Sequence, residues 1–155
     1  AISASHFLLG NLLMAQTWFN KILKERFEGH SADVIAYIHV FKLLIAFELG
    51  DNEMLEEALS EASKRSGKGY VNTEYESTMF KHFTALLVCR TKKKQTEVFK
   101  LLHADLQQLA TKGYDAIPQR EIFQPIPWIR AKIEERDALE LTREYNKGKQ
   151  EMMNP

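Results

Sequence analysis

The stretch Val34–Leu49 constrains the fold of this chain more than any other. Thirteen of its sixteen residues are apolar, and only His39, Lys42 and Glu48 interrupt them. A helix that is apolar on every side has to be surrounded, either in a protein core or in a membrane. Sixteen residues are fewer than the roughly 20 that span a bilayer, and two charged residues lie within the run. The sequence therefore predicts a central helix that is the most buried element of a protein core.

The residues that flank this stretch predict its ends. Ser31 or Asp33 can accept hydrogen bonds from the first free amides of the helix, and Gly50 can adopt the left-handed conformation that ends one. Asp51 or Asn52 can cap the next helix in the same way. We therefore expect a helical hairpin made of the central helix, a tight turn and a second helix.

Apolar residues at helical spacing predict further helices on both sides. A capping box of Thr73 and Glu76 marks the start of one, and Thr91–Lys94 is expected to link it to the next. No stretch alternates with the period of two that is typical of a strand. The protein is predicted to be all-α, with short links between antiparallel neighbours. About six helices are expected, over about 5–27, 34–49, 52–65, 73–90, 95–112 and 128–136.

The segment 118–136 contains three prolines, which exclude one long helix. Pro127 suits the first turn of a short helix. We expect Trp128 to anchor this capping segment against the end of the fourth or fifth helix. The polar tail 137–155 is expected to be a loosely attached helix or disordered.

The central helix and the helix that starts at Thr73 can be overlaid with an offset of 39 residues. The matched residues are Phe41-Lys42 with Phe80-Lys81, Leu44 with Phe83, Ala46 with Ala85, and Phe47 with Leu86. Each helix is followed by a turn and a second amphipathic helix. This pattern predicts two hairpins, 34–66 and 73–112, stacked side by side. Coincidence between two helices rich in Leu and Phe is the alternative.

The first hairpin resembles a tetratricopeptide repeat. The turn Leu49–Asp51 looks like the inter-helix turn of that family, whose second helix would place packing residues at Leu55, Leu59 and Ala62. Leu43 departs from the pattern, because the family has a small residue there. The chain is similar to divergent tetratricopeptide-like segments of large uncharacterised bacterial proteins. The resemblance implies a short right-handed α-solenoid that binds other proteins or peptides on its concave side.

The length of 155 residues corresponds to one ordinary domain. We expect residues 1–136 to form a single helical-repeat domain. The apolar helical pattern begins almost at Ala1, whereas natural termini usually start with a few disordered residues. We therefore expect a fragment of a longer protein whose missing part continues the same architecture. A processed or trimmed N-terminus is the alternative.

Charge and cysteine content limit the function classes. The 21 basic and 21 acidic residues give a formal net charge of zero, which argues against a dedicated nucleic-acid binder. Cys89 is the only cysteine and cannot form an internal disulfide, so a reducing compartment is expected. No signal-peptide pattern is visible. We expect a cytoplasmic protein that does not associate with membranes.

Known catalytic and metal-binding motifs are missing from the sequence. His39, His82 and His103 lie in different predicted helices, and none has a second ligand at helical spacing. The loop Ser66–Gly69 lacks the spacing of a phosphate-binding loop. We therefore expect no enzymatic activity, no metal site and no cofactor.

Two function classes remain. The first is a scaffold that binds a protein or peptide, with polar residues on the first helix of each hairpin as the candidate contacts. These are His39, Lys42, Lys81 and His82. The second is a regulatory or nucleic-acid-associated helical domain that would use a basic cluster to contact phosphates. The cluster consists of Arg90, Lys92, Lys93 and Lys94. Its structural interpretation, stabilisation of a helix C-terminus and of a soluble loop, is favoured because no aromatic residues are interleaved.

Overall fold

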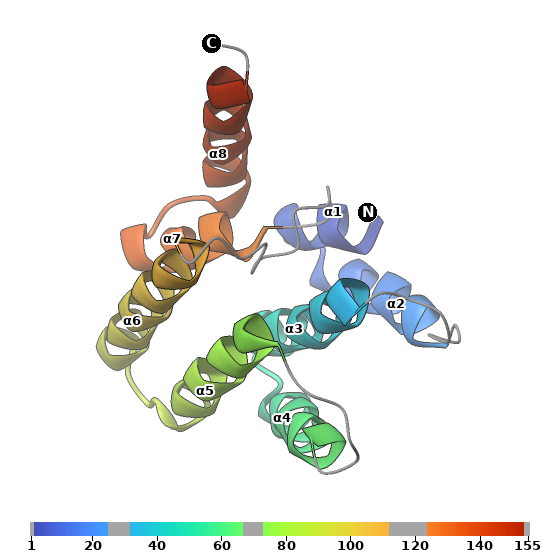
Figure 1. Ribbon diagram of the computed structural model, residues 1–155. Helices are drawn as coiled ribbons and strands as arrows, with labels where there is room; N and C mark the ends of the chain where they lie inside the picture. Colours follow the sequence, from blue (N-terminus) through green and yellow to red (C-terminus); the bar gives the residue numbers. More distant parts are fainter. Residues whose placement is uncertain (1, 25–31, 67–72, 112–123, 154–155) are drawn as a thin grey trace.

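The computed structural model describes residues 2–24, 32–66, 73–111 and 124–153, which form helices and turns with no strand (Figure 1). Eight helices lie in these ranges: α1 Ile2–Leu8, α2 Leu12–Leu23, α3 Ala32–Leu49, α4 Asn52–Ser66, α5 Glu74–Val88, α6 Lys92–Thr111, α7 Pro125–Glu134 and α8 Ala138–Met153. The prediction of an all-α protein is confirmed. The predicted number of about six helices is too low, because the first predicted helix is divided and the tail is helical.

The central helix α3 lies among α2, α4 and α5 (Figure 1). Its side chains Ile38, Phe41 and Ile45 are at most 5% exposed. Of the described helices, α3 contributes the most buried residues, so the prediction that it is the most buried element is confirmed. The helix starts before Asp33, so this predicted cap lies in its first turn. The alternative cap, Ser31, lies outside the described residues.

The prediction of one continuous first helix is wrong. The chain forms α1 and α2, which are separated by the turn Leu9–Asn11. Gly10 in this turn has φ = 74°, a conformation that glycine adopts without steric cost. The apolar pattern continues through the break, because α1 and α2 pack against each other and each needs an apolar face. The sequence therefore predicted one helix where the structure has two. The end of the predicted helix, beyond residue 24, lies outside the described residues.

Local signals correctly predicted the end of α3 and the starts of α4 and α5. Gly50 has φ = 67° after α3, and Asp51 caps α4 by accepting a 2.9 Å hydrogen bond from the backbone N–H of Met54. Thr73 and Glu76 form the predicted capping box at the start of α5. The Thr73 hydroxyl accepts from the Glu76 backbone N–H at 3.1 Å, and the carboxylate accepts from the Thr73 N–H at 2.9 Å.

The helices α3, α4, α5 and α6 pack in the order of the two predicted hairpins. α4 contacts both α3 and α5, and α5 also contacts α3 and α6. Leu44 on α3 and Phe83 on α5, which the 39-residue offset matches, are both fully buried. The predicted link Thr91–Lys94 is wrong, because α6 begins at Lys92 and its lysines form the first helical turn.

Trp128 anchors α7 among four phenylalanine rings. Its ring centroid lies 5.5 Å from that of Phe99 on α6, 6.0 Å from Phe47 on α3, and 6.3 Å from both Phe83 on α5 and Phe7 on α1. The side chain is 2% exposed. The predicted contact with the fourth or fifth helix is confirmed for both, α5 and α6, but Phe83 and Phe99 do not lie at the C-terminal ends of these helices. The contacts with α1 and α3 were not predicted.

The C-terminal segment is more regular than the sequence suggested. α7 begins at Pro125, and Pro127 also lies in its first turn, where a proline removes no helical hydrogen bond. Pro118 lies outside the described residues. In the predicted tail, α8 forms a helix that packs on α7, and its Leu141 is fully buried. Of the two outcomes expected for the tail, the structure shows a helix.

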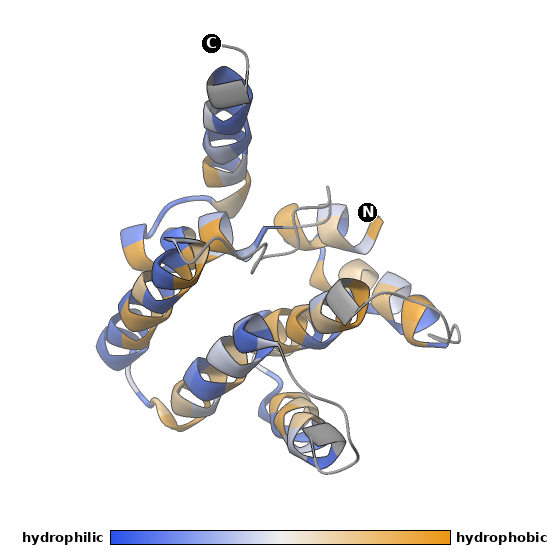
Figure 2. Cartoon of the chain, viewed as in Figure 1, coloured by the Kyte–Doolittle hydropathy of each residue, from blue (hydrophilic) through white to orange (hydrophobic). Residues whose placement is uncertain are grey.

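Hydropathy differs between the centre and the end of the chain. Figure 2 shows α3 as hydrophobic along most of its length and α8 as hydrophilic beyond its first turns. None of the described helices combines the length and the apolar content that crossing a bilayer requires.

Phe41→Ala should lower the free energy of unfolding by about 3–5 kcal/mol, because it removes a buried ring and leaves a cavity. The ring packs edge-on against Phe7 and Phe19 at centroid distances of 5.3 and 5.6 Å. Urea denaturation followed by circular dichroism measures the loss. Leu101→Ala, which truncates an exposed side chain, is the control. A loss below about 1 kcal/mol would place Phe41 outside the core.

Trp128→Ala should release α7 and α8, because the ring contacts four other helices. Trypsin should then cut the native variant after Arg130 or Lys132 at least about tenfold faster than the wild type. Trp128→Phe retains a ring but loses the 2.6 Å hydrogen bond that Nε1 donates to Glu48, so an intermediate rate is expected. Equal rates in the wild type and Trp128→Ala would show that the ring does not hold this segment.

Candidate functional site

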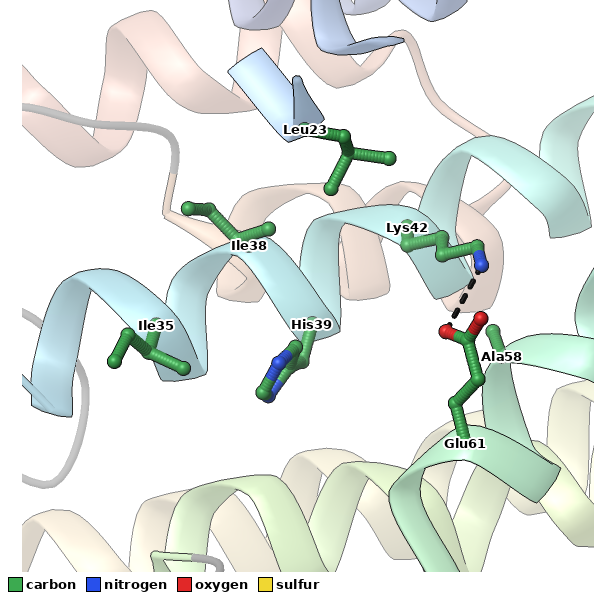
Figure 3. A pocket seen from close by; sticks show the side chains of 7 residues that line it. All are labelled: Leu23, Ile35, Ile38, His39, Lys42, Ala58 and Glu61. Atoms are coloured by element: carbon green, nitrogen blue, oxygen red, sulfur yellow. Dashed lines mark hydrogen bonds and ion pairs between the residues drawn. The ribbon is translucent and has the colours of Figure 1, made fainter. Parts of the chain in front are cut away.

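A pocket of about 240 Å³ opens between the end of α2, the first half of α3 and the middle of α4 (Figure 3). We call it the α2–α4 pocket. Its lining consists of Leu23, Ile35, Ile38, His39, Lys42, Ala58 and Glu61. Two predicted partner contacts, His39 and Lys42, therefore lie in the same pocket. Apolar side chains from all three helices form the rest of its wall.

Lys42 forms the polar side of the pocket together with α4. Its Nζ lies 3.0 Å from a carboxylate oxygen of Glu61 and 3.8 Å from one of Glu57. The side chain of Lys42 is only 15% exposed, whereas those of Glu61 and Glu57 are 44% and 65% exposed. A lysine can bury its aliphatic part against apolar neighbours while its ammonium group reaches the rim. The ammonium group of Lys42 is therefore paired with a carboxylate that lines the pocket, Glu61, and lies near a second one outside the lining, Glu57.

His39 connects the pocket to α5. Its Nδ1 lies 2.7 Å from a carboxylate oxygen of Glu76, whose side chain is completely buried. The same carboxylate group closes the capping box with Thr73. One buried side chain therefore fixes both the start of α5 and the orientation of the His39 ring.

Lys81 and His82, the other two predicted partner contacts, lie away from the pocket. Both bind Asp105 on α6, with distances of 3.2 Å from Lys81 Nζ and 2.8 Å from His82 Nε2. The hydrogen bond from His82 is the main reason that the pKa of the Asp105 carboxyl lies below its ordinary value, and the bond from Lys81 adds to it. The structure thus divides the four predicted residues into two separate pairs.

The basic cluster also divides. Arg90 follows the end of α5 and lines a separate hollow between α4 and α5, whereas Lys92, Lys93 and Lys94 form the first turn of α6. Lys92 Nζ lies 2.7 Å from a carboxylate oxygen of Glu135. The predicted role at a helix C-terminus is wrong for the three lysines, because they lie at an N-terminus. There the helix dipole disfavours positive charge.

Sequence reasoning missed the contribution of α4 to the pocket. Glu61 was not predicted as a site residue, yet it pairs with Lys42. A signal was present in the sequence, because residues at similar distances from the turn of an antiparallel hairpin face each other. Lys42 lies eight residues before Gly50, and Glu61 lies eleven residues after it. Leu23 could not be found in this way, because its position depends on how α2 packs on α3.

The chemistry of the α2–α4 pocket is that of side-chain recognition. Its apolar walls can bury an aliphatic or aromatic group, and the pair Lys42–Glu61 can bind a polar end. Among the described residues of the lining there is no serine, threonine or cysteine that could act as a nucleophile. Within the described ranges, no three His, Cys, Asp or Glu side chains are grouped so that they could hold a metal ion.

Asp105→Asn should reduce stability by an amount that depends on pH. Because the folded-state pKa of Asp105 is lowered, its carboxylate stabilises the fold fully above the unfolded-state pKa. This contribution is lost as pH falls through the folded-state pKa. Urea midpoints measured from neutral to acidic pH should therefore converge for the wild type and the variant. A difference that stays constant over this range would contradict the prediction, and Glu53→Gln on the exposed face of α4 is the control.

Comparison of the chain with protein-family models, with curated proteins and with solved structures gave no match.

Proposed function

We propose that this protein is a non-catalytic scaffold that binds a segment of another protein in the α2–α4 pocket. The observation that carries the proposal is the position of His39 and Lys42. Both are polar residues on the most buried helix, and both lie in a pocket whose other walls are largely apolar. Partner-binding pockets typically combine an apolar surface with a few placed polar groups.

The size of the pocket supports a side chain as its occupant. Sites for cofactors and drug-sized ligands usually have volumes of about 300–1,000 Å³, and the α2–α4 pocket has about 240 Å³. A single anchoring side chain of a peptide needs less space than a cofactor. Anchors of this kind, seated in a pocket, carry much of the binding energy in protein interfaces.

The proposal includes a tetratricopeptide-like arrangement of α3 to α6 as a short right-handed α-solenoid. The order of the contacts supports it, because the first helix of the second hairpin, α5, packs against both helices of the first. Lys42 and Lys81, matched by the 39-residue offset, also each bind a carboxylate on the second helix of their own hairpin. Stacked hairpins of this kind form extended surfaces for partners.

A photoreactive residue in place of Leu23 should capture the partner, because this side chain lines the pocket and is 37% exposed. The same residue in place of Leu101 is the matched control on α6. The captured segment is then made as a peptide and its affinity measured by calorimetry. Leu23→Glu should weaken binding at least about tenfold, because it places a carboxylate against the apolar part of the ligand.

Two results would argue against the proposal. One is equal capture by the probes at positions 23 and 101. The other is an affinity that Leu23→Glu leaves unchanged while Leu101→Glu lowers it. Thermal unfolding of both variants shows whether they are folded, since substitutions at exposed positions usually change stability little.

The placement of three lysines favours one alternative, a nucleic-acid-associated domain. Lys92, Lys93 and Lys94 are exposed in the first turn of α6, where they do not stabilise the helix dipole. Binding of a single-stranded RNA probe should then weaken steeply with salt, and the slope should fall when the three lysines are replaced by glutamine. Absence of RNA binding at low salt would eliminate this alternative.

A further inference from the structure

An apolar surface without a neighbour among the described residues lies on α1 and α2. It consists of Ile2, Leu9, Leu13 and Met14, which are 47–72% exposed. These four residues, which we call the α1–α2 face, make up more than half of the seven large apolar side chains that are exposed in the described ranges. Single exposed apolar residues are ordinary, but a cluster of them marks an interaction surface.

The geometry of α1 and α2 places these side chains together. The Ser3 hydroxyl donates a 2.7 Å hydrogen bond to the carbonyl of Ala15, so the start of α1, with Ile2, lies beside the first turn of α2, which contains Leu13 and Met14. Leu9 lies in the connection between α1 and α2, and Leu13 lies in the first turn of α2. The opposite side of α2, with Ala15 and Phe19, is fully buried in the core. The first turn of α2 is therefore apolar on its exposed side as well as on its covered side.

The charges of α1 and α2 themselves select the kind of partner at the Leu13–Met14 part of this face, whereas Glu48 and Asp137 line a hollow beside Leu9. Residues 1–24 contain no aspartate or glutamate. Lys21 and Lys24 are exposed on α2, and Lys21 Nζ lies 4.0 Å from the centre of the Trp18 ring. A partner that covers the apolar residues would bring its own flanking charges close to these lysines. Acidic flanking residues are favoured there, and basic ones are repelled.

We propose that the α1–α2 face binds an amphipathic helix of another protein, whose apolar stripe is bordered by acidic residues. A helix laid along α2 would bury Leu13 and Met14 and bring its flank to Lys21 and Lys24. Amphipathic helices bind apolar surfaces in this way, through apolar residues of the bound helix that are spaced one turn apart. The surface is separate from the α2–α4 pocket, so the proposal does not depend on the function of that pocket.

A second copy of this chain fits the face less well. The exposed acidic residues of α4 are Glu53, Glu56 and Glu57, but its neighbouring apolar residues Met54 and Leu59 are half-buried in the core. No other described helix presents an exposed apolar stripe, since Val88 and Leu101 are isolated. Two α1–α2 faces in contact would bring like charges together.

An anionic membrane is also a weaker match. The apolar face and two lysines are the features of a surface-bound helix, but reversible attachment usually needs a larger basic cluster or a lipid anchor. The exposed glutamates of α4 would be repelled by the same membrane. A protein helix needs only a few complementary charges, because close packing of apolar side chains provides most of the binding energy.

Two synthetic helical peptides of about 18 residues, or five turns, test the proposal. They share one leucine stripe and differ only in flanks of glutamate or of lysine. Fluorescence anisotropy at low salt should show that the glutamate peptide binds the full chain at least about tenfold more tightly than the lysine peptide. Leu13→Glu should abolish binding of both, and Leu101→Glu should have no effect. Replacing Lys21 and Lys24 by glutamine should remove the preference between the peptides.

Four results would overturn the proposal. The first is equal affinity for the two peptides in the wild type, and the second is binding that Leu13→Glu leaves intact. The third is a wild-type dimer in analytical ultracentrifugation that Leu13→Glu dissociates, which would assign the face to a second copy. The fourth is binding to phosphatidylcholine–phosphatidylserine vesicles, lost in Leu13→Glu, with no binding of either peptide. Circular dichroism of Leu13→Glu verifies that this variant, altered at an exposed position, is folded.

Discussion

The packing of Trp128 is the constraint on which the rest of the structure depends. Its indole connects α7 to rings on α1, α3, α5 and α6, so residues more than a hundred positions apart share one core. Aromatic pairs in edge-on and offset geometries add to the energy of simple burial. The indole N–H needs a partner in this environment and finds it in Glu48, which also binds Lys132. Glu48, the only acidic residue of the apolar run 34–49, is therefore used to attach the C-terminal segment.

The polar residues in the apolar run of α3 each attach another helix, as Glu48 attaches α7. Each of the three that interrupt its apolar run binds a group on a different helix: His39 binds Glu76 on α5, Lys42 binds Glu61 on α4, and Glu48 binds Trp128 on α7. Because a buried polar group is costly unless it is paired, each pair favours one packing of its helix over shifted alternatives. Hydrophobic burial makes α3 central, and these three contacts determine which surfaces of the other helices meet it.

Local sequence signals predicted much of the fold, whereas the site depended on tertiary packing. The apolar run of α3 and the capping box at Thr73 involve residues close in sequence, and both predictions are confirmed. Gly10 was missed because apolar residues on both sides continue the helical pattern through the break. The lysines of α6 were assigned to a link because charge suggests a loop, but lysine is also a good helix former. The α2–α4 pocket needs α2 positioned beside α4, which no local pattern encodes.

The separation of charge along the chain gives its surfaces different preferences. Residues 1–24 carry lysine but no acidic residue, whereas residues 51–62 carry five acidic residues and no lysine or arginine. The net charge of zero is the sum of the charges of such segments, so it does not show that basic and acidic residues are separated along the chain. On one side, Lys21 and Lys24 flank an exposed apolar face. On the other, Glu61 lines a pocket whose lysine is already paired. Electrostatic complementarity acts over a Debye length of about 8–10 Å, so each surface selects its partner by its own charges rather than by those of the whole chain.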